Sequence, residues 1–352
     1  MFNPKYKLNN KIISRLTSIA EARIIIEKAK LLPKQEINLR RQAVVRMTHN
    51  STGIEGNILS LKQVESIVNG IKVDAPERDI YEVENYLKTL KYITEIIKKK
   101  ESISKKVILK IHKLVTNKTL PKNQSGFYRL GQVYVVSRRP GLSDKIIYTA
   151  PQANRVPKLM DDLIEWIKKN EKEKVNPVII AGIVHQEIAA IHPFSDGNGR
   201  TARALATLIL YKMGYDFRKL FALEDYYNKD RPSYYNAINI GSNYDSRTVD
   251  FTPWLEYFIK GFEEEIEKVK KTVINLSFKR VKKDINSKIY LDENQLKIID
   301  FLESIGRITV KDVIDILNCS RRKAQLDMQK LKKIKMVSQI GKGPSSAYIL
   351  AK

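Results

Sequence analysis

The stretch His192-Pro-Phe-Ser-Asp-Gly-Asn-Gly-Arg-Thr-Ala-Arg203 joins two segments whose apolar residues recur with helical spacing. Its glycines, Gly197 and Gly199, allow backbone conformations that other residues rarely adopt. Successive amide hydrogens can therefore converge on an anion at the start of a helix that begins near Asn198. The sequence thus predicts a phosphate-binding turn at this point of the chain.

Four side chains in the same stretch can supply the other parts of a phosphate-transfer site. Arg200 and Arg203 are three residues apart on the expected helix, so both guanidinium groups can face the same phosphates. Asp196 can hold magnesium against phosphate oxygens, and His192 can take a proton from an attacking hydroxyl. Any one of these residues alone would more often be structural, but the four together in this order indicate catalysis.

Helical periodicity dominates the sequence on both sides of this stretch. The segment 176–191 is apolar around much of its circumference, which predicts a helix through the centre of a domain. Ser60 with Gln63 forms a capping box, and Gly70 is the matching stop signal. The other helices expected before residue 279 span residues 11–31, 35–48, 60–69, 77–99, 104–116, 153–170, 198–213, 231–240 and 250–275.

Strand signals occur in two regions. The β-branched and aromatic runs at 131–136 and 145–150, separated by turn formers, predict a hairpin. Near the C-terminus, two short strands around a Gly-Pro turn follow three helices, an order that predicts a small winged helix-turn-helix domain. These helices are expected at 293–305, 309–317 and 320–334, after a basic linker or helix tail at 279–288.

Basic charge gathers on the last of these helices. Residues 320–335 carry seven Lys or Arg residues and a single acid, Asp327. Such charge on a groove-reading helix makes DNA binding one interpretation. A protein-contact role stays open, because winged helices also serve that purpose and a charge run is most often a solvated face.

Composition excludes several classes of protein. At 352 residues the chain exceeds the size at which one hydrophobic core usually stops growing, so two or three domains are expected. The single cysteine, Cys319, excludes an internal disulfide, and no Cys/His cluster suits a zinc site. The N-terminus lacks a secretory signal and no apolar run is long enough to span a membrane, so we expect a cytoplasmic protein with no membrane partner. The net charge of +25 suits nucleic acid or acidic partners but is spread over the whole chain.

The stretch 192–203 resembles the signature of the Fic family, HPFx[D/E]GN[G/K]RxxR, at every defined position. The resemblance implies a mainly α fold, a helical bundle with a β-hairpin flap. It implies transfer of AMP from ATP, with Mg²⁺, to a Tyr, Thr or Ser hydroxyl of a target protein or of the chain itself. In this pattern His192 is the general base and Asp196 the metal ligand. The implied phosphate-binding residues are Gly197, Asn198, Gly199, Arg200 at the β-phosphate and Arg203 at the γ-phosphate.

Two other regions resemble the same family. The hairpin at 131–150 is similar to the flap that holds a target segment as an added strand. Tyr234 and Tyr235 fall where family members place aromatic side chains near the adenine of the nucleotide. Two core aromatics on a helix are an equally good interpretation of this pair.

A possible brake lies upstream of the signature. Residues Ser51–Asn57 fit the family's inhibitory pattern, [S/T]xxxE[G/N], through Ser51, Glu55 and Gly56. A carboxylate placed against Arg203 would occupy the guanidinium that should hold the γ-phosphate. The resemblance implies an inhibitory helix that precedes the catalytic core, and it also allows Glu55 to position a water that removes AMP.

We therefore expect three regions: an N-terminal helical region at 1–100 with the inhibitory motif, a Fic catalytic domain at 101–284, and a winged helix-turn-helix domain at 285–352. An autoinhibited AMP transferase fits best. A DNA-binding regulator with a Fic body and a Fic enzyme with another nucleotide donor are the alternatives, and a homodimer is left open. The remaining histidines lack metal-ligand spacing and are expected to be structural: His49, His112 and His185.

Overall fold

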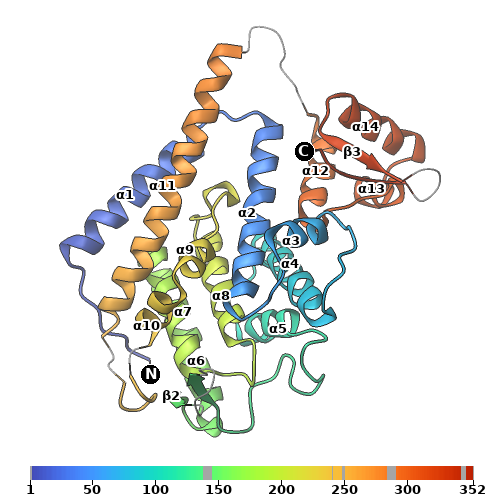
Figure 1. The fold of residues 1–352 in the computed structure, drawn as a ribbon. Helices are drawn as coiled ribbons and strands as arrows, with labels where there is room; N and C mark the ends of the chain where they lie inside the picture. The colour runs from blue at the N-terminus through green and yellow to red at the C-terminus, as the bar shows by residue number, and fades with distance from the viewer. Residues whose placement is uncertain are drawn as a thin grey trace.

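The computed structural model is mainly helical, as the sequence predicts (Figure 1). It describes residues 2–137, 145–239, 241–247, 250–283, 291–341 and 346–351. Within these ranges the sheets are two antiparallel hairpins, β1 (Tyr134–Ser137) with β2 (Lys145–Thr149) and β3 (Val337–Ile340) with β4 (Ala347–Leu350). No helix in the same ranges is long and apolar enough to cross a membrane.

The helical bundle consists of α1 (Asn10–Lys28), α2 (Pro33–Ile54), α3 (Leu61–Val68), α4 (Glu77–Lys98), α5 (Lys105–Val115), α6 (Val156–Lys172), α7 (Pro177–Ile191), α8 (Asn198–Lys212), α9 (Glu224–Lys229), α10 (Arg231–Ile238) and α11 (Thr252–Lys283), with short 3₁₀ turns η1 (Ala153–Arg155) and η2 (Phe217–Lys219). α1 packs along α11, α2 packs against α4 and α9, and α5 packs against α4 and α8. The capping box that the sequence predicts at the start of α3 is present.

α7 is the central helix, as its apolar sequence predicts. Almost all of its side chains are buried, and it packs against α6, α8 and α11. A Cβ on Gly182 would come within 2.9 Å of Leu255, and the Trp254 indole N–H donates to the Gly182 carbonyl at 2.6 Å. The signature stretch therefore leaves the C-terminal end of the most enclosed helix in the bundle.

α2 is longer than the sequence predicts. Apolar periodicity predicts a helix over 35–48, but α2 continues to Ile54. The added residues are mostly polar and are held from outside the helix, since the Asn50 amide donates to Asp225 and the Ser51 hydroxyl contacts α8. Tertiary contacts override weak local propensity here, so most of the inhibitory motif lies on a helix that faces the core.

α11 also extends past its predicted end at residue 275, to Lys283. The stretch 279–288, predicted as a linker or helix tail, is thus a helix tail up to that residue. Its Lys and Arg residues are good helix formers, which explains the extension. The predicted boundary near residue 285 lies outside the described residues.

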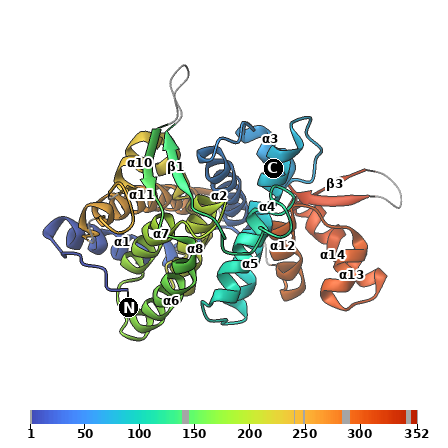
Figure 2. The same ribbon diagram turned by 90° about the horizontal axis from the view of Figure 1, so that it is seen from below.

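The C-terminal residues form three helices and a hairpin in the predicted order: α12 (Glu293–Ile305), α13 (Val310–Leu317), α14 (Arg321–Lys333), then β3 and β4. Ile298, Leu302 and Met328 belong to a separate hydrophobic cluster, which Ile37 of α2 joins. This C-terminal unit lies at one side of the bundle (Figure 2), where α12 packs against α2. The Gly-Pro turn lies outside the described residues.

Candidate active site

Two left-handed residues shape the loop between α7 and α8. His192 ends α7 with φ 50°, and Gly197 precedes α8 with φ 77°. The buried Asn198 side chain then holds the loop closed, because its amide accepts from the Phe194 N–H and donates to the Phe194 carbonyl, both at 2.9 Å. Asn198 therefore fixes the shape of the phosphate-binding turn through its side chain.

His112 supports this loop from α5, which agrees with its expected structural role. Its ring stacks on Phe194 with a centroid separation of 3.7 Å. The Gly126 N–H donates to Nδ1 at 2.9 Å, so Nε2 carries the hydrogen and donates to the Asp196 carbonyl at 3.0 Å. Burial lowers the pKa of His112 to about 4, which keeps the ring neutral in this role.

His192 is arranged as a base. Its Nδ1 lies 3.2 Å from the Ala189 carbonyl, which can only accept, so Nδ1 carries the hydrogen and Nε2 is left with a lone pair. Burial lowers the pKa of His192 below 6.5, so the ring is neutral near pH 7. Arg129, which the sequence did not single out, braces this residue because its Nε donates to the His192 carbonyl at 2.8 Å.

The glycines at the start of α8, where the sequence predicts a phosphate-binding turn, have close neighbours. A Cβ on Gly197 would lie 2.7 Å from the Thr116 methyl group. A Cβ on Gly199 would collide with the Glu55 carboxylate. The first observation explains why the turn needs glycine, and the second places the Glu55 carboxylate directly over the phosphate-binding turn.

Arg203 is held by the predicted inhibitory motif across a sequence separation of 152 residues. Its Nε donates to the Ser51 hydroxyl at 2.9 Å, and its Nη2 donates to the Ser51 carbonyl at 2.7 Å and to the Glu55 carboxylate at 2.8 Å. The Arg203 side chain is only 1% exposed, whereas the Glu55 side chain is 27% exposed, so the carboxylate reaches a buried guanidinium from the protein surface. The structure thus brings together the two motifs that the sequence placed far apart.

Arg200 has a partner of its own, which the sequence did not indicate. Its Nη1 lies 3.1 Å from a Glu82 carboxylate oxygen on α4, and both side chains are buried. The other Glu82 oxygen accepts from the Asn57 amide at 3.0 Å. Glu82 therefore links Arg200 to the turn that follows α2.

Asp196 lies beside Arg200 and Arg78, and its carboxylate is suited to a hard cation. One carboxylate oxygen accepts from the Gly197 N–H at 2.6 Å, and the other lies 3.6 Å from both Arg200 and Arg78. No cluster of three or more His, Cys, Asp or Glu residues forms elsewhere in the described ranges. A single carboxylate at the cradle fits Mg²⁺, which proteins commonly bind through one or two carboxylates plus substrate phosphates.

The two candidate adenine residues differ in burial. Tyr234 is 2% exposed, stacks on Tyr227, and shares a hydrogen bond of 3.0 Å with His185, which suits the core-packing interpretation. Tyr235 is 46% exposed, and its hydroxyl donates to the Ile54 carbonyl at 3.0 Å. Tyr235 is therefore the member of the pair with an open ring, next to the inhibitory helix. α2 ends at Ile54 with Glu55 as its cap, and the next residue, Gly56, has a φ of 98°.

The predicted hairpin stands near the catalytic loop. Its strands pair with an irregularity between Val135 and Val136, and the Tyr148 hydroxyl donates to the Ala190 carbonyl of α7 at 2.8 Å. Apolar side chains on both strands are exposed, among them Tyr134 and Ile146. The base of the hairpin is thus fixed to the helix that carries His192. Residues 138–144 lie outside the described part.

Comparison with known proteins points to one family. Residues 102–210 match the model of the Fic/DOC family. The chain is 29% identical to a protein adenylyltransferase Fic of Nematostella vectensis over 269 residues, which are 75% of this chain and 57% of that protein. It is 33% identical to the protein of the same name of Culex quinquefasciatus over 178 residues, 50% of this chain and 33% of that one. The chain therefore spans about a third to a little over half the length of these relatives.

Solved structures share the fold. A Fic family protein from Desulfovibrio desulfuricans aligns with 99% of this chain and 98% of its own at a TM-score of 0.63 and 24% identity. A Fic-domain-containing signaling protein from Bacteroides thetaiotaomicron aligns with 75% of this chain and 98% of its own at a TM-score of 0.60 and 18% identity. The predicted helical bundle with a hairpin is confirmed.

Proposed function

Because residues 102–210 form a domain of the Fic/DOC family, we propose that the chain transfers AMP from ATP to a Tyr, Thr or Ser hydroxyl of a target protein or of itself. One observation carries this proposal. The lone pair of His192, the glycine turn and the guanidinium of Arg203 meet at the start of α8. A base, an anion cradle and a cationic clamp are the parts that nucleotidyl transfer requires.

The chemistry is a displacement at the α-phosphorus of ATP. The target hydroxyl oxygen attacks this phosphorus, and its proton passes to Nε2 of His192. The bond from the α-phosphorus to the bridging oxygen breaks, and pyrophosphate leaves with the electron pair. The first N–H groups of α8 and the side chains of Arg200 and Arg203 would hold the departing phosphates.

Asp196 would hold Mg²⁺ together with the phosphates of ATP. When bound, the cation would neutralise charge that builds up on the phosphate oxygens during transfer. Asp196 is placed for this because its carboxylate lies beside the first turn of α8. Arg200 and Arg78, at 3.6 Å from the carboxylate, hold that side chain in position.

Glu55 would act as a brake on this reaction. Its carboxylate bonds the Arg203 guanidinium and covers Gly199, so it competes with the γ-phosphate for the same place. ATP could then bind only in a pose that does not align the α-phosphorus with the base. Removal of AMP by a water that Glu55 positions, a homodimer and a cytoplasmic location remain predictions.

Labelled ATP tests the proposed function. We expect the Glu55→Gly variant, incubated with Mg²⁺ and a cell lysate, to label proteins from ATP carrying the label on the α-phosphate. ATP labelled on the γ-phosphate should give no more labelled protein than the lysate gives without the variant, and intact mass should show additions equal to one AMP. Label from the γ-phosphate would indicate phosphate transfer instead, and label from UTP alone would indicate a different nucleotide donor.

The C-terminal unit carries features that support contact with DNA as a second function. The single acid of α14, Asp327, is buried and accepts from Lys323 at 3.1 Å. The exposed face of the helix is therefore basic, with Arg321, Arg322, Lys330 and Lys333. A basic helix of a winged helix-turn-helix unit can enter the major groove.

Fluorescence anisotropy with duplex DNA tests this second function. We expect the affinity of the full chain to fall by more than about tenfold between about 50 and 200 mM salt, because phosphate contacts release counterions. Arg322→Ala should weaken binding, whereas Lys169→Ala, on the exposed face of α6, should leave it unchanged. DNA binding that is absent at low salt, or equal for both variants, would assign α14 to protein contact.

A further inference from the structure

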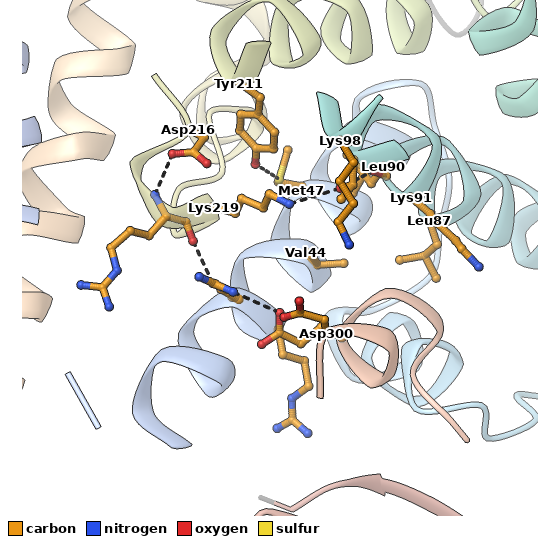
Figure 3. A pocket seen from close by; sticks show the side chains of 15 residues that line it. Val44, Met47, Leu87, Leu90, Lys91, Lys98, Tyr211, Asp216, Lys219 and Asp300 are labelled. Atoms are coloured by element: carbon orange, nitrogen blue, oxygen red, sulfur yellow. Dashed lines mark hydrogen bonds and ion pairs between the residues drawn. The ribbon is translucent and has the colours of Figure 1, made fainter. Parts of the chain in front are cut away.

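A cavity of about 200 Å³ lies where α12 meets α2, α4 and η2 (Figure 3). None of its lining residues belongs to the signature stretch or to the inhibitory motif. Six basic and three acidic residues line it, so its charge favours an anion. Its apolar lining comes from Val44, Met47, Leu87, Leu90 and Tyr211.

Lys219 enters this cavity from a strained turn. Phe217, Arg218 and Lys219 have φ values of 45°, 58° and 60°, so three consecutive non-glycine residues occupy the left-handed region. Such residues are strained and persist only where the surrounding structure holds them in place, and strain of this kind clusters at active sites and ligand sites. Figure 3 shows the Lys219 side chain reaching toward Lys98.

The Lys219 ammonium group forms no direct ion pair with a described residue, although Asp216 and Glu303 lie near enough to act on it. Its Nζ donates to the Thr94 hydroxyl at 3.4 Å, and no acid in the described ranges lies within ion-pair distance of it. Burial, with the nearby charge of Arg40, lowers the pKa of Lys219. An unpaired, partly desolvated cation is costly, and an anion in the cavity would remove that cost.

The opposite wall offers a polar contact of a different kind. Glu303 of α12 lies 3.5 Å from Arg40 through one carboxylate oxygen, while the other oxygen is buried and has no hydrogen-bond partner among the described residues. Burial raises the pKa of Glu303 to about 7. This oxygen can accept from a hydroxyl group, and Lys219 lines the same cavity.

The volume limits the size of an occupant. A dry protein cavity of about 150 Å³ holds one benzene molecule. A cavity of 200 Å³ therefore has room for one ring or a short carbon chain with a charged group, and it is too small for a nucleotide.

We propose that this cavity binds a small organic anion, a carboxylate or phosphate monoester with an apolar body and a hydroxyl group at the far end. Lys219 and Lys98 hold the anionic group, Glu303 accepts from the hydroxyl, and the apolar residues of α2 and α4 contact the body. Because α12 forms one wall, the occupant also bridges the C-terminal unit and α2. This binding is independent of the proposed AMP transfer.

Titration of the chain with 4-hydroxybenzoate and with 4-hydroxyphenyl phosphate tests the proposal. We expect at least one of these anions to bind with a Kd of about 1 mM or tighter and to shift the NMR methyl signals of Met47, Leu87 or Leu90. The matched neutral compound, 4-hydroxybenzyl alcohol, should bind at least about tenfold more weakly, because it lacks the charge that Lys219 recognises.

Two lysine variants separate the site from general charge. Lys219→Met keeps the length of the side chain and should weaken anion binding about tenfold or more. Lys99→Met, at the exposed end of α4 and outside the cavity, is the control and should bind as the unaltered chain does. Circular dichroism melting checks that both variants are folded. Equal affinity for the alcohol and the acid, equal binding by the two variants, or no binding of either anion at about 10 mM would overturn the proposal.

Discussion

Replacing His192 with alanine is expected to lower the rate of AMP transfer by about 10²- to 10⁴-fold, the range for loss of a general base. The ring holds its Nδ1 hydrogen against the Ala189 carbonyl, so Nε2 is the atom that can take the proton. Alanine leaves no proton acceptor in its place. Initial rates of labelling from α-labelled ATP measure the effect, with Glu55→Gly present in both proteins so that the reference rate is high.

The affinity for ATP is the control for this experiment. His192 lies before the turn that is proposed to hold the phosphates, so calorimetry should give similar ATP affinities with and without the ring. A His192→Ala protein that binds ATP and transfers AMP at the unaltered rate would remove His192 from the mechanism.

The same histidine sets an expected pH dependence. The neutral ring is the active form, and burial lowers its pKa below 6.5. The rate should therefore stay level at neutral pH and fall only as the pH drops below that value. A rate that already declines between pH 8 and pH 7, in an enzyme that stays folded and binds ATP, would assign the base to another group.

The parts of the site that could be predicted are those that chain connectivity places together. His192, Asp196, Arg200 and Arg203 occupy one loop and the first turns of one helix, so their proximity follows from sequence spacing. The buried position of α7 follows from its apolar circumference. In these cases the local sequence pattern correctly predicts where the residues lie in the fold.

Other parts depend on contacts between distant segments, which no local pattern reveals. Arg129 braces His192 across 63 positions, and His112 holds the Asp196 carbonyl across 84. The chain has 64 Lys and Arg residues, and no spacing pattern around Arg129 distinguishes it from the others. Glu82 is likewise one of several acids on α4, and only the tertiary structure brings Arg200 and Asn57 to it.

The length of α2 shows the same limit. Its last residues lack apolar periodicity and are helical because α8 and α9 bind them. The family resemblance therefore predicts the contact between Glu55 and Arg203, whereas the hydrophobic pattern does not. The contact itself, with Ser51 holding the same guanidinium, comes from the tertiary structure.

Replacing Glu55 with glycine is expected to raise the rate of AMP transfer by about ten- to a hundredfold. Hydrogen bonds to charged groups contribute about 1.5–3 kcal/mol, and loss of this one would free Arg203 for the γ-phosphate by a corresponding factor. Glu55 is the residue at which α2 ends, so the change should not shorten the helix. Labelling from α-labelled ATP at equal protein concentration measures the gain.

Two variants separate release of the clamp from loosening of the helix. Glu55→Gln keeps the shape of the side chain and removes its charge, so it should give a smaller gain than glycine, because a neutral amide still covers Gly199. Ser51→Ala removes one bond to Arg203 but leaves the carboxylate in place, so it should leave the rate low. If Ser51→Ala activates as strongly as Glu55→Gly, the position of α2 rather than the Glu55 carboxylate is the brake.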